Sequence, residues 1–326
     1  MGRDTNSMKL VVAQFNSISP ENLLKWGPVN PRPGEFNFEP ADSFVAFGER
    51  NNMFIVGHCL VWHAQTPRWV FTDDKGKSVS RDVLLQRMKE HIFTVVGRYK
   101  GRINGWDVVN EALEDSGELR KSQWLNIIGE DFIEKAFEFA HEADPSAELY
   151  YNDYNLFLPA KRKGAIRIIN NLKAKGITIT GVGMQGHWGL DYPTKDELET
   201  SLKEYSETGV KIMITEMDID VLPNPSNYTG AEINTNFELR KELDPYKEGL
   251  PDSMQTVLAN RYADIFKSFE KFKDSITRIT FWGVTDGMSW KNGFPVRGRT
   301  NYPLLFDRNF KPKPAFDAVI KTVTGK

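Results

Sequence analysis

The stretch WDVVNEAL, residues 106–113, starts as an apolar run and ends abruptly in Asn110 and Glu111. A short run of Trp and Val is typical of a strand that is buried on both faces. Burying a carboxylate at the tip of such a strand costs free energy unless the group has a partner or a task. Taken alone, the stretch fits a capped strand end as well as a catalytic site, but the rest of the chain repeats its pattern.

Similar apolar runs recur along the chain and alternate with longer amphipathic stretches. We expect buried parallel strands at residues 13–19, 52–58, 102–110, 147–153, 179–185, 210–216 and 276–282. Helical periodicity marks residues 80–99, 129–143 and 161–176, with Ser80 as the N-cap of the first helix. No Ser-, Pro- or Gly-rich linker interrupts the alternation, so the sequence predicts one α/β domain over residues 1–326 with a parallel sheet.

The number of expected strands is seven, whereas a closed (β/α)8 TIM barrel needs eight. Either residues 9–12 begin an extra strand, or the first strand lies upstream of residue 1. We favour the second reading, because RDTNSMKLVVAQ (residues 3–14) can equally form the helix that follows such a strand. Residues 221–252 form a long irregular region, which in a compact domain is usually functional or mobile.

The composition argues against several other classes of protein. The formal net charge of −2 disfavours a phosphate-binding surface and hence a nucleic acid partner. No apolar run reaches the length of about 18 residues that spans a membrane. Cys59 is the only cysteine, so an intrachain disulfide is impossible. The N-terminal residues lack a signal-peptide core, which fits either a cytoplasmic protein or a chain that starts after its targeting segment.

Polar side chains gather at the carboxyl ends of five expected strands. They are His58, Asn110 with Glu111, Asn152 with Asp153, Gln185 and Glu216. In a parallel barrel these ends converge on one face, which is the face where active sites are found. Caps and turns explain polar residues at the end of one strand, but they do not readily explain polar residues at the same end of five strands.

Two of these residues, Glu111 and Glu216, are carboxylates on different strands. Glycoside hydrolysis requires such a pair, one member protonated to donate to the leaving oxygen and the other ionised to attack the anomeric carbon. The surroundings of the two groups must therefore push their pKa values apart. We expect His187 to hydrogen-bond the ionised member and Asp218 to orient His187.

Aromatic side chains flank the same strand ends, and flat apolar rings beside hydrogen-bonding groups suit a sugar. They are Trp62, Tyr154, Trp188, Trp282 and Trp290. Metal and cofactor chemistry is not indicated, because His58 and His63 do not share a helical face and no dinucleotide fingerprint or nucleophile elbow occurs. We therefore expect no metal and no cofactor.

The chain resembles the family 10 glycoside hydrolases, the endo-β-1,4-xylanases, over nearly all of its length. The matching blocks are FNSISPENLLKW (15–26), GHCLVWHAQTPRW (57–69), WDVVNEAL (106–113), LYYNDYN (149–155), GVGMQGHW (181–188), ITEMDID (214–220), FWGVTDGMSW (281–290) and PLLFDRNFKPKPAF (303–316). Eight ordered blocks are far more specific than a single motif. The resemblance implies a (β/α)8 barrel that hydrolyses internal β-1,4 bonds of xylan with retention of anomeric configuration.

By the same resemblance, Glu111 is the acid/base and Glu216 the nucleophile. Asn110 is expected to bond the 2-hydroxyl of the sugar being cleaved, and Tyr154 to serve the leaving-group side. The other implied sugar-binding residues are Glu21, Asn22, Lys25, His58, Trp62, Gln65, Gln185, His187, Trp282 and Trp290. The expected partners are xylan and xylo-oligosaccharides.

The family normally carries a first strand ahead of the segment that matches residues 3–16, so the chain is expected to be N-terminally truncated relative to it. The family is usually exported, which implies that the native protein is secreted. Two other functions remain open. One is a related barrel glycosidase acting on cellulose or mixed-linked glucan, and the other is a carbohydrate-binding protein with little catalysis, against which the two retained glutamates argue.

Overall fold

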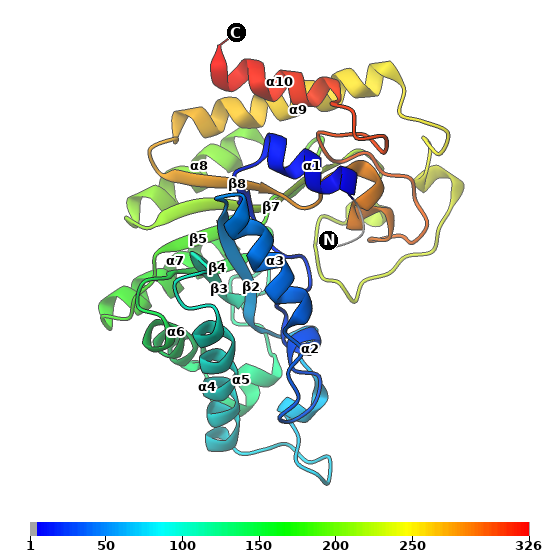
Figure 1. Cartoon of the computed structure of the whole chain (residues 1–326). Helices are drawn as coiled ribbons and strands as arrows, with labels where there is room; N and C mark the ends of the chain where they lie inside the picture. The colour runs from blue at the N-terminus through cyan, green and yellow to red at the C-terminus, as the bar shows by residue number, and fades with distance from the viewer. Residues whose placement is uncertain (1–4, 326) are drawn as a thin grey trace.

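A computed structural model describes residues 5–325 of the chain, and Figure 1 shows its strands wrapped by helices. The strands are β1 (Ser17–Ile18), β2 (Phe54–Trp62), β3 (Gly105–Asn110), β4 (Glu148–Asp153), β5 (Gly181–Met184), β6 (His187–Gly189), β7 (Lys211–Asp220) and β8 (Ile276–Phe281). The helices are α1 (Thr5–Gln14), α2 (Trp26–Val29), α3 (Glu39–Arg50), α4 (Arg81–Arg98), α5 (Gln123–Ile128), α6 (Phe132–Ala143), α7 (Pro159–Ala174), α8 (Lys195–Glu207), α9 (Asp252–Lys271) and α10 (Pro314–Thr324).

The strands form a nearly closed parallel barrel of the TIM type, as the alternation in the sequence predicts. Pairing runs from β1 through β2, β3 and β4 to β5, then to β7, and β8 pairs with β7. The short strands β5 and β6 both pair with β7. They are two halves of one barrel strand, interrupted near Gly186, whose φ of 84° lies in the left-handed region that glycine tolerates.

The barrel is open along a seam between β1 and β8. Within residues 5–325, β1 pairs with β2 alone and β8 with β7 alone. Residues 9–12 lie inside α1, so the alternative of an extra strand there is wrong, and the helix that leads into β1 is present as expected.

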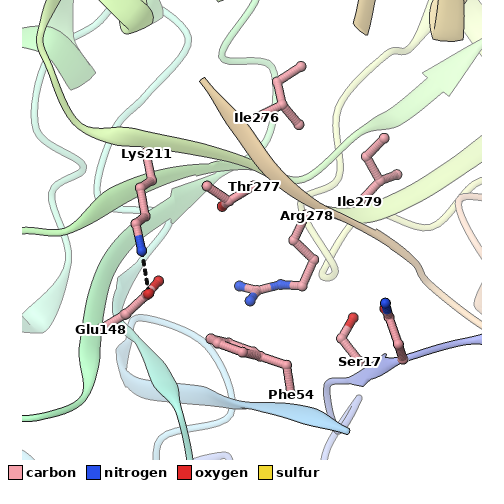
Figure 2. Close-up of a pocket in the computed structure, with 9 residues that line it drawn as sticks. Ser17, Phe54, Glu148, Lys211, Ile276, Thr277, Arg278 and Ile279 are labelled. Carbon is pink, nitrogen blue, oxygen red and sulfur yellow. Dashed lines mark hydrogen bonds and ion pairs between the residues drawn. The ribbon is translucent and has the colours of Figure 1, made fainter. Parts of the chain in front are cut away.

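Two cavities mark the seam. One, of about 530 Å³, is lined largely by apolar side chains that include Val11, Phe15 and Phe281. The other, of about 570 Å³, lies where β1 and β2 face the start of β8. Figure 2 shows Arg278 of β8 reaching across this second cavity toward Phe54 of β2, and its guanidinium carbon is 4.6 Å from the Phe54 ring centre. The side chains of β8 are consequently half-buried or, at Thr277, exposed, whereas those of β3 are buried.

Local sequence accounts for the ends and the close packing of the elements. The Ser80 hydroxyl accepts a hydrogen bond from the Val83 amide and caps α4, as predicted. Gly57 of β2 lies opposite Trp106 of β3, and a Cβ added at Gly57 would lie 2.1 Å from the Trp106 ring. The glycine therefore makes room for one of the largest buried side chains of the core.

Residues 221–251 form an irregular segment, here called the β7 loop, that follows β7 at the carboxyl side of the barrel and ends where α9 begins. The loop contains two short 3-10 turns, Pro225–Asn227 and Lys241–Leu243. Phe237 pairs with Val296, and Asp244 accepts a hydrogen bond from the Thr300 amide, so the loop is attached to the segment that follows β8. In residues 5–325, no helix combines the length and apolar character needed to cross a membrane.

Candidate active site

A cavity of about 180 Å³ opens at the carboxyl ends of the barrel strands. Its lining comes from all the barrel strands except β4, or from the segments that follow them: Glu21, Asn22, Lys25, His58, Trp62, Gln65, Asn110, Glu111, Gln185, His187, Glu216, Ala231, Ile233, Trp282 and Trp290. Of the residues that the sequence predicts at this face, most line the cavity, and five do not: Asn152, Asp153, Tyr154, Trp188 and Asp218. Parallel strands direct their carboxyl ends to one face, which explains why residues so distant in sequence meet there.

Glu216, on β7, is held by three neighbours. The Asn152 amide donates to its Oε1 at 2.8 Å, His187 Nε2 lies 3.1 Å from its Oε2, and His58 Nδ1 lies 3.9 Å from its Oε1. Burial raises the pKa of this carboxyl, but the His187 hydrogen bond and the charges of His58 and His187 outweigh burial. The net pKa of Glu216 is lowered, which favours the carboxylate.

His187 is fixed in turn by Asp218, two residues beyond Glu216 on the same strand. His187 Nδ1 lies 3.1 Å from Asp218 Oδ2, and Trp290 Nε1 donates to the same oxygen at 2.7 Å. Burial lowers the pKa of His187, but Asp218 and Glu216 outweigh burial and raise this pKa to about 9. Glu216, His187 and Asp218 therefore form a chain in which a cationic imidazole bridges two carboxylates.

Glu111 follows β3 and has different surroundings. Trp62 Nε1 donates to its Oε2 at 2.8 Å, and the Gln185 amide donates to its Oε1 at 2.9 Å. Burial is the main influence and raises its pKa, reinforced by the charges of Asp153 and Glu216 and opposed by His63 and Gln185. The net pKa of Glu111 is raised, so the protonated form is favoured.

The backbone at Glu111 is strained. Its φ of 56° lies in the left-handed region, which costs a non-glycine residue about 1–3 kcal/mol. Two hydrogen bonds hold this conformation, from the Glu111 amide to the Asn152 carbonyl at 2.9 Å and from Arg120 Nε to the Glu111 carbonyl at 3.1 Å. This backbone conformation directs the carboxyl group of Glu111 into the cavity.

Asn110, directly before Glu111, is oriented by other amides. Its Oδ1 accepts hydrogen bonds from Asn152 at 2.9 Å and from Gln185 at 3.4 Å. Among residues 5–325, none accepts a hydrogen bond from its Nδ2, so this donor is available to a ligand. That arrangement fits the expected contact with a sugar hydroxyl.

The walls of the cavity combine flat rings with polar groups. Lys25 Nζ lies 4.7 Å from the Trp62 ring centre and donates to Asn22 Oδ1 at 3.0 Å. The Trp282 ring meets His58 edge-on at 5.3 Å, and the Trp290 ring stacks on Phe294 at 4.5 Å. Such walls offer both the apolar faces and the hydrogen-bonding edges that a pyranose ring requires.

Three residues at or beside the strand ends do not line this cavity. Trp188 does not line the cavity, because it is only 2% exposed and packs against Phe269 in the core. Tyr154 does not line it, and Arg120 donates to its hydroxyl at 2.9 Å; its role on the leaving-group side stays a prediction. Asp153 is buried against Lys161 at 2.9 Å, an ion pair that supports the fold rather than the cavity.

Four residues around the site carry no strong signal in the sequence. Asp107 Oδ2 lies 2.8 Å from His58 Nδ1 and fixes the imidazole, and only its charge within an apolar run marks it out. His63, Arg120 and Glu232 meet beside Glu111 from three separate loops, and no periodicity links them. In residues 5–325, no three His, Cys, Asp or Glu side chains gather as metal ligands.

Comparison with known proteins gives a consistent result. The model of the Glycosyl hydrolase family 10 matches residues 2–322. The chain is 49% identical to Endo-1,4-beta-xylanase A of Xylanibacter ruminicola, with 98% of this chain and 86% of that protein covered. It is 44% identical to Endo-1,4-beta-xylanase of Geobacillus stearothermophilus, covering 95% and 90%.

Two solved structures are similar over the whole fold. A GH10 endoxylanase retrieved from a sugarcane soil metagenome has a TM-score of 0.96 and 51% identity, covering 98% of this chain and 93% of that one. A mutant in complex with xylotriose has a TM-score of 0.87 and 37% identity, covering 97% and 92%.

Proposed function

The chain belongs to glycosyl hydrolase family 10 and is an endo-1,4-β-xylanase, and from this premise we propose that Glu216 is its nucleophile and Glu111 its general acid and base. The observation that carries the assignment is the contrast between the partners of the two carboxyl groups: His187 and His58 face Glu216 and lower its pKa, whereas Trp62 and Gln185 donate to Glu111 and burial raises its pKa. An acid must hold its proton and a nucleophile must lose it, so each environment suits one role.

The reaction proceeds in two displacements. The Glu216 carboxylate attacks the anomeric carbon while Glu111 protonates the glycosidic oxygen, and the shortened xylan leaves. The ester formed between the sugar and Glu216 is then attacked by water, which Glu111, now ionised, deprotonates. Each step inverts the anomeric carbon, so the product retains its configuration, and this mechanism corresponds to carboxyl groups roughly 5–5.5 Å apart.

The neighbours of Glu216 supply the support that a nucleophile needs. Asn152 and His187 occupy both of its oxygens in the resting state. When Glu216 bonds to the sugar it loses its charge, and the cationic His187 remains balanced by Asp218. We assign the 2-hydroxyl contact to Asn110, whose free donor lies beside the reacting carboxyl groups.

The aromatic walls of the cavity are proposed to select xylan over cellulose. Trp62, Trp282 and Trp290 are proposed to bound the sugar rings, with Glu21, Asn22, Lys25 and Gln65 bonding their hydroxyls. Cellulose differs from xylan by a hydroxymethyl group on each ring, which a pocket rejects strongly only when a wall clashes with it. Trp282 and Trp290 are the walls placed to do so.

Two single variants test the assignment. Glu216→Ala is expected to abolish sugar release from every substrate while xylan binding persists. Glu111→Ala is expected to lower kcat/KM on xylan by about 10²–10⁴-fold, the usual contribution of general acid catalysis. It is expected to spare kcat/KM for the release of 2,4-dinitrophenol from its xylobioside, because that leaving group needs no proton and kcat/KM reports only the first displacement, before Glu111 acts as a base.

The result that would overturn the assignment is an equal loss on both substrates in Glu111→Ala. Hydrolysis of carboxymethyl-cellulose as fast as xylan would overturn the proposed selectivity.

We also propose that residues 1–326 act as one catalytic domain and that the protein works outside the cell, where a polymer as large as xylan is found. Activity in the culture medium rather than the cell fraction of the source organism tests the last point.

A further inference from the structure

The β7 loop forms part of the cavity wall through Ala231 and Ile233. The residue between them, Glu232, points away from the cavity and joins side chains from two other loops. Its Oε2 lies 3.1 Å from His63 Nε2 and 3.1 Å from Arg120 Nη1. We call this group of three, Glu232, His63 and Arg120, the Glu232 clasp.

The carboxylate of Glu232 is fully engaged. Its second oxygen, Oε1, accepts a hydrogen bond from the Asn234 side-chain amide at 2.9 Å. The His63 hydrogen bond is the main influence on its pKa, which is lowered to about 2. Glu232 is therefore anionic at neutral and mildly acidic pH, and it presents a negative charge to Arg120.

Arg120 connects Glu232 to the acid/base residue, Glu111. Its Nε donates to the Glu111 carbonyl at 3.1 Å, and its Nη2 donates to the Tyr154 hydroxyl at 2.9 Å. The guanidinium is mostly buried, with its side chain 12% exposed, and two carboxylates face its Nη1, Glu232 at 3.1 Å and Glu114 at 3.5 Å. A planar guanidinium whose fork is occupied on every side has one orientation, and that orientation fixes the strained Glu111 backbone.

We propose that Glu232 is a positioning residue for the acid/base step: through Arg120 it holds the Glu111 backbone in the geometry that aims the carboxyl at the glycosidic oxygen. The inference rests on the proposed role of Glu111. It gives the β7 loop a second task besides forming the wall, because the same segment that contacts the sugar also orients the proton donor. A displacement of about 1 Å in such a donor can cost a hundredfold in rate.

The β7 loop is also attached through residues other than Glu232, so the contact between Glu232 and Arg120 can be removed without detaching the loop. The Tyr228 ring packs against Phe237 at 5.6 Å and against Phe294 at 6.1 Å. The Phe237 amide also donates to the Pro295 carbonyl at 2.9 Å. Glu232→Gln is therefore expected to loosen Arg120 while the wall formed by Ala231 and Ile233 stays in place.

The experiment compares Glu232→Gln with Glu238→Gln in the full chain. Glu238 lies on the same loop and is exposed, so the control removes the same charge without touching the clasp. We measure kcat/KM, which reports the first displacement, on xylobiosides of phenol and of 2,4-dinitrophenol. Glu232→Gln is expected to lose about 10- to 100-fold on the phenyl substrate and almost nothing on the dinitrophenyl substrate, with Glu238→Gln unchanged on both.

An equal loss on both substrates, or no loss on either, overturns the proposal, since a role in the wall or in folding alone does not distinguish leaving groups. A double variant with Arg120→Gln adds a second measure, because residues acting through one contact give losses that do not add. If Glu232→Gln does not fold, Arg120→Lys tests the same contact from the other side, because a single ammonium cannot donate to Glu232 and to the Glu111 carbonyl as the guanidinium does, and it must show the same selective loss. The Glu111→Ala result separates the two proposals: if it is selective and Glu232→Gln is not, only the clasp fails.

Discussion

At the scale of single residues, the feature that needs explanation is how one cavity holds two buried glutamates in opposite protonation states. Burial raises the pKa of both. Glu216 overcomes burial because two imidazoles face it, whereas Glu111 meets neutral donors from Trp62 and Gln185 and the negative charge of Asp153. The difference therefore comes from the partners and not from the degree of burial.

This difference predicts the pH dependence of the reaction. Glu216 must be ionised, and its pKa is lowered, so activity is expected to fall only once the pH drops below the ordinary glutamate value of 4.5. Glu111 must be protonated in the first step, and its pKa is raised, so the alkaline limb is expected above that value. A profile of kcat/KM against pH on xylan measures both limbs, which belong to the coupled pair.

The variant His187→Ala tests the cause of the acidic limb of the pH profile. It removes the hydrogen bond and the charge that lower the pKa of Glu216, so the acidic limb is expected to move to higher pH. His141→Ala, on helix α6 outside the barrel, is the control and is expected to leave the profile unchanged. An acidic limb that stays in place in His187→Ala would contradict the proposed cause of the shift.

At the scale of elements, the packing of neighbouring strands depends on which residues lack a side chain. Gly57→Ala places a methyl group where the Trp106 ring lies, and the buried tryptophan has no free space to enter. We expect a loss of about 1–3 kcal/mol in the free energy of unfolding, the usual cost of overpacking a core. Urea denaturation followed by tryptophan fluorescence measures it.

Gly97→Ala is the matched control for this substitution. Gly97 is an exposed residue of α4, and an added Cβ meets nothing within 4 Å. The substitution is expected to stabilise the protein by up to about 1 kcal/mol, because alanine favours the helix. Equal effects of the two substitutions would show that strand packing at Gly57 is not tight.

Elements are also the scale at which the sequence is most informative. Apolar runs locate the strands, and the polar residues at their ends locate the cavity, because both follow from the regular geometry of a parallel barrel. Periodicity cannot show that the strand around Gly186 divides into β5 and β6, or that β1 is only two residues long. It also cannot pair Glu232 with Arg120, since loop contacts between residues 112 positions apart depend on the folded shape.

At the scale of the whole molecule, the seam between β1 and β8 is the place where the barrel can accept a further strand. The facing edges of β1 and β8 leave backbone groups without strand partners in the described part of the chain. Unpaired edges are sites of association with other chains, and proteins normally cover them. The apolar cavity beside them, lined by Val11, Phe15 and Phe281, is shaped to receive further apolar side chains.

An extended segment placed ahead of residue 1 is therefore expected to enter the seam and pair in parallel with both edges. A fused segment of about six Val- and Ile-rich residues, a common strand length, followed by a short turn, tests this. We expect Tm to rise by at least about 2 °C, since each kcal/mol gained shifts the Tm of a large domain by about that much. A segment of equal length with alternate prolines is the control, because proline cannot donate to a strand partner. If both segments raise Tm equally, or neither does, the seam does not accept a strand, and its two edges are stable as they stand.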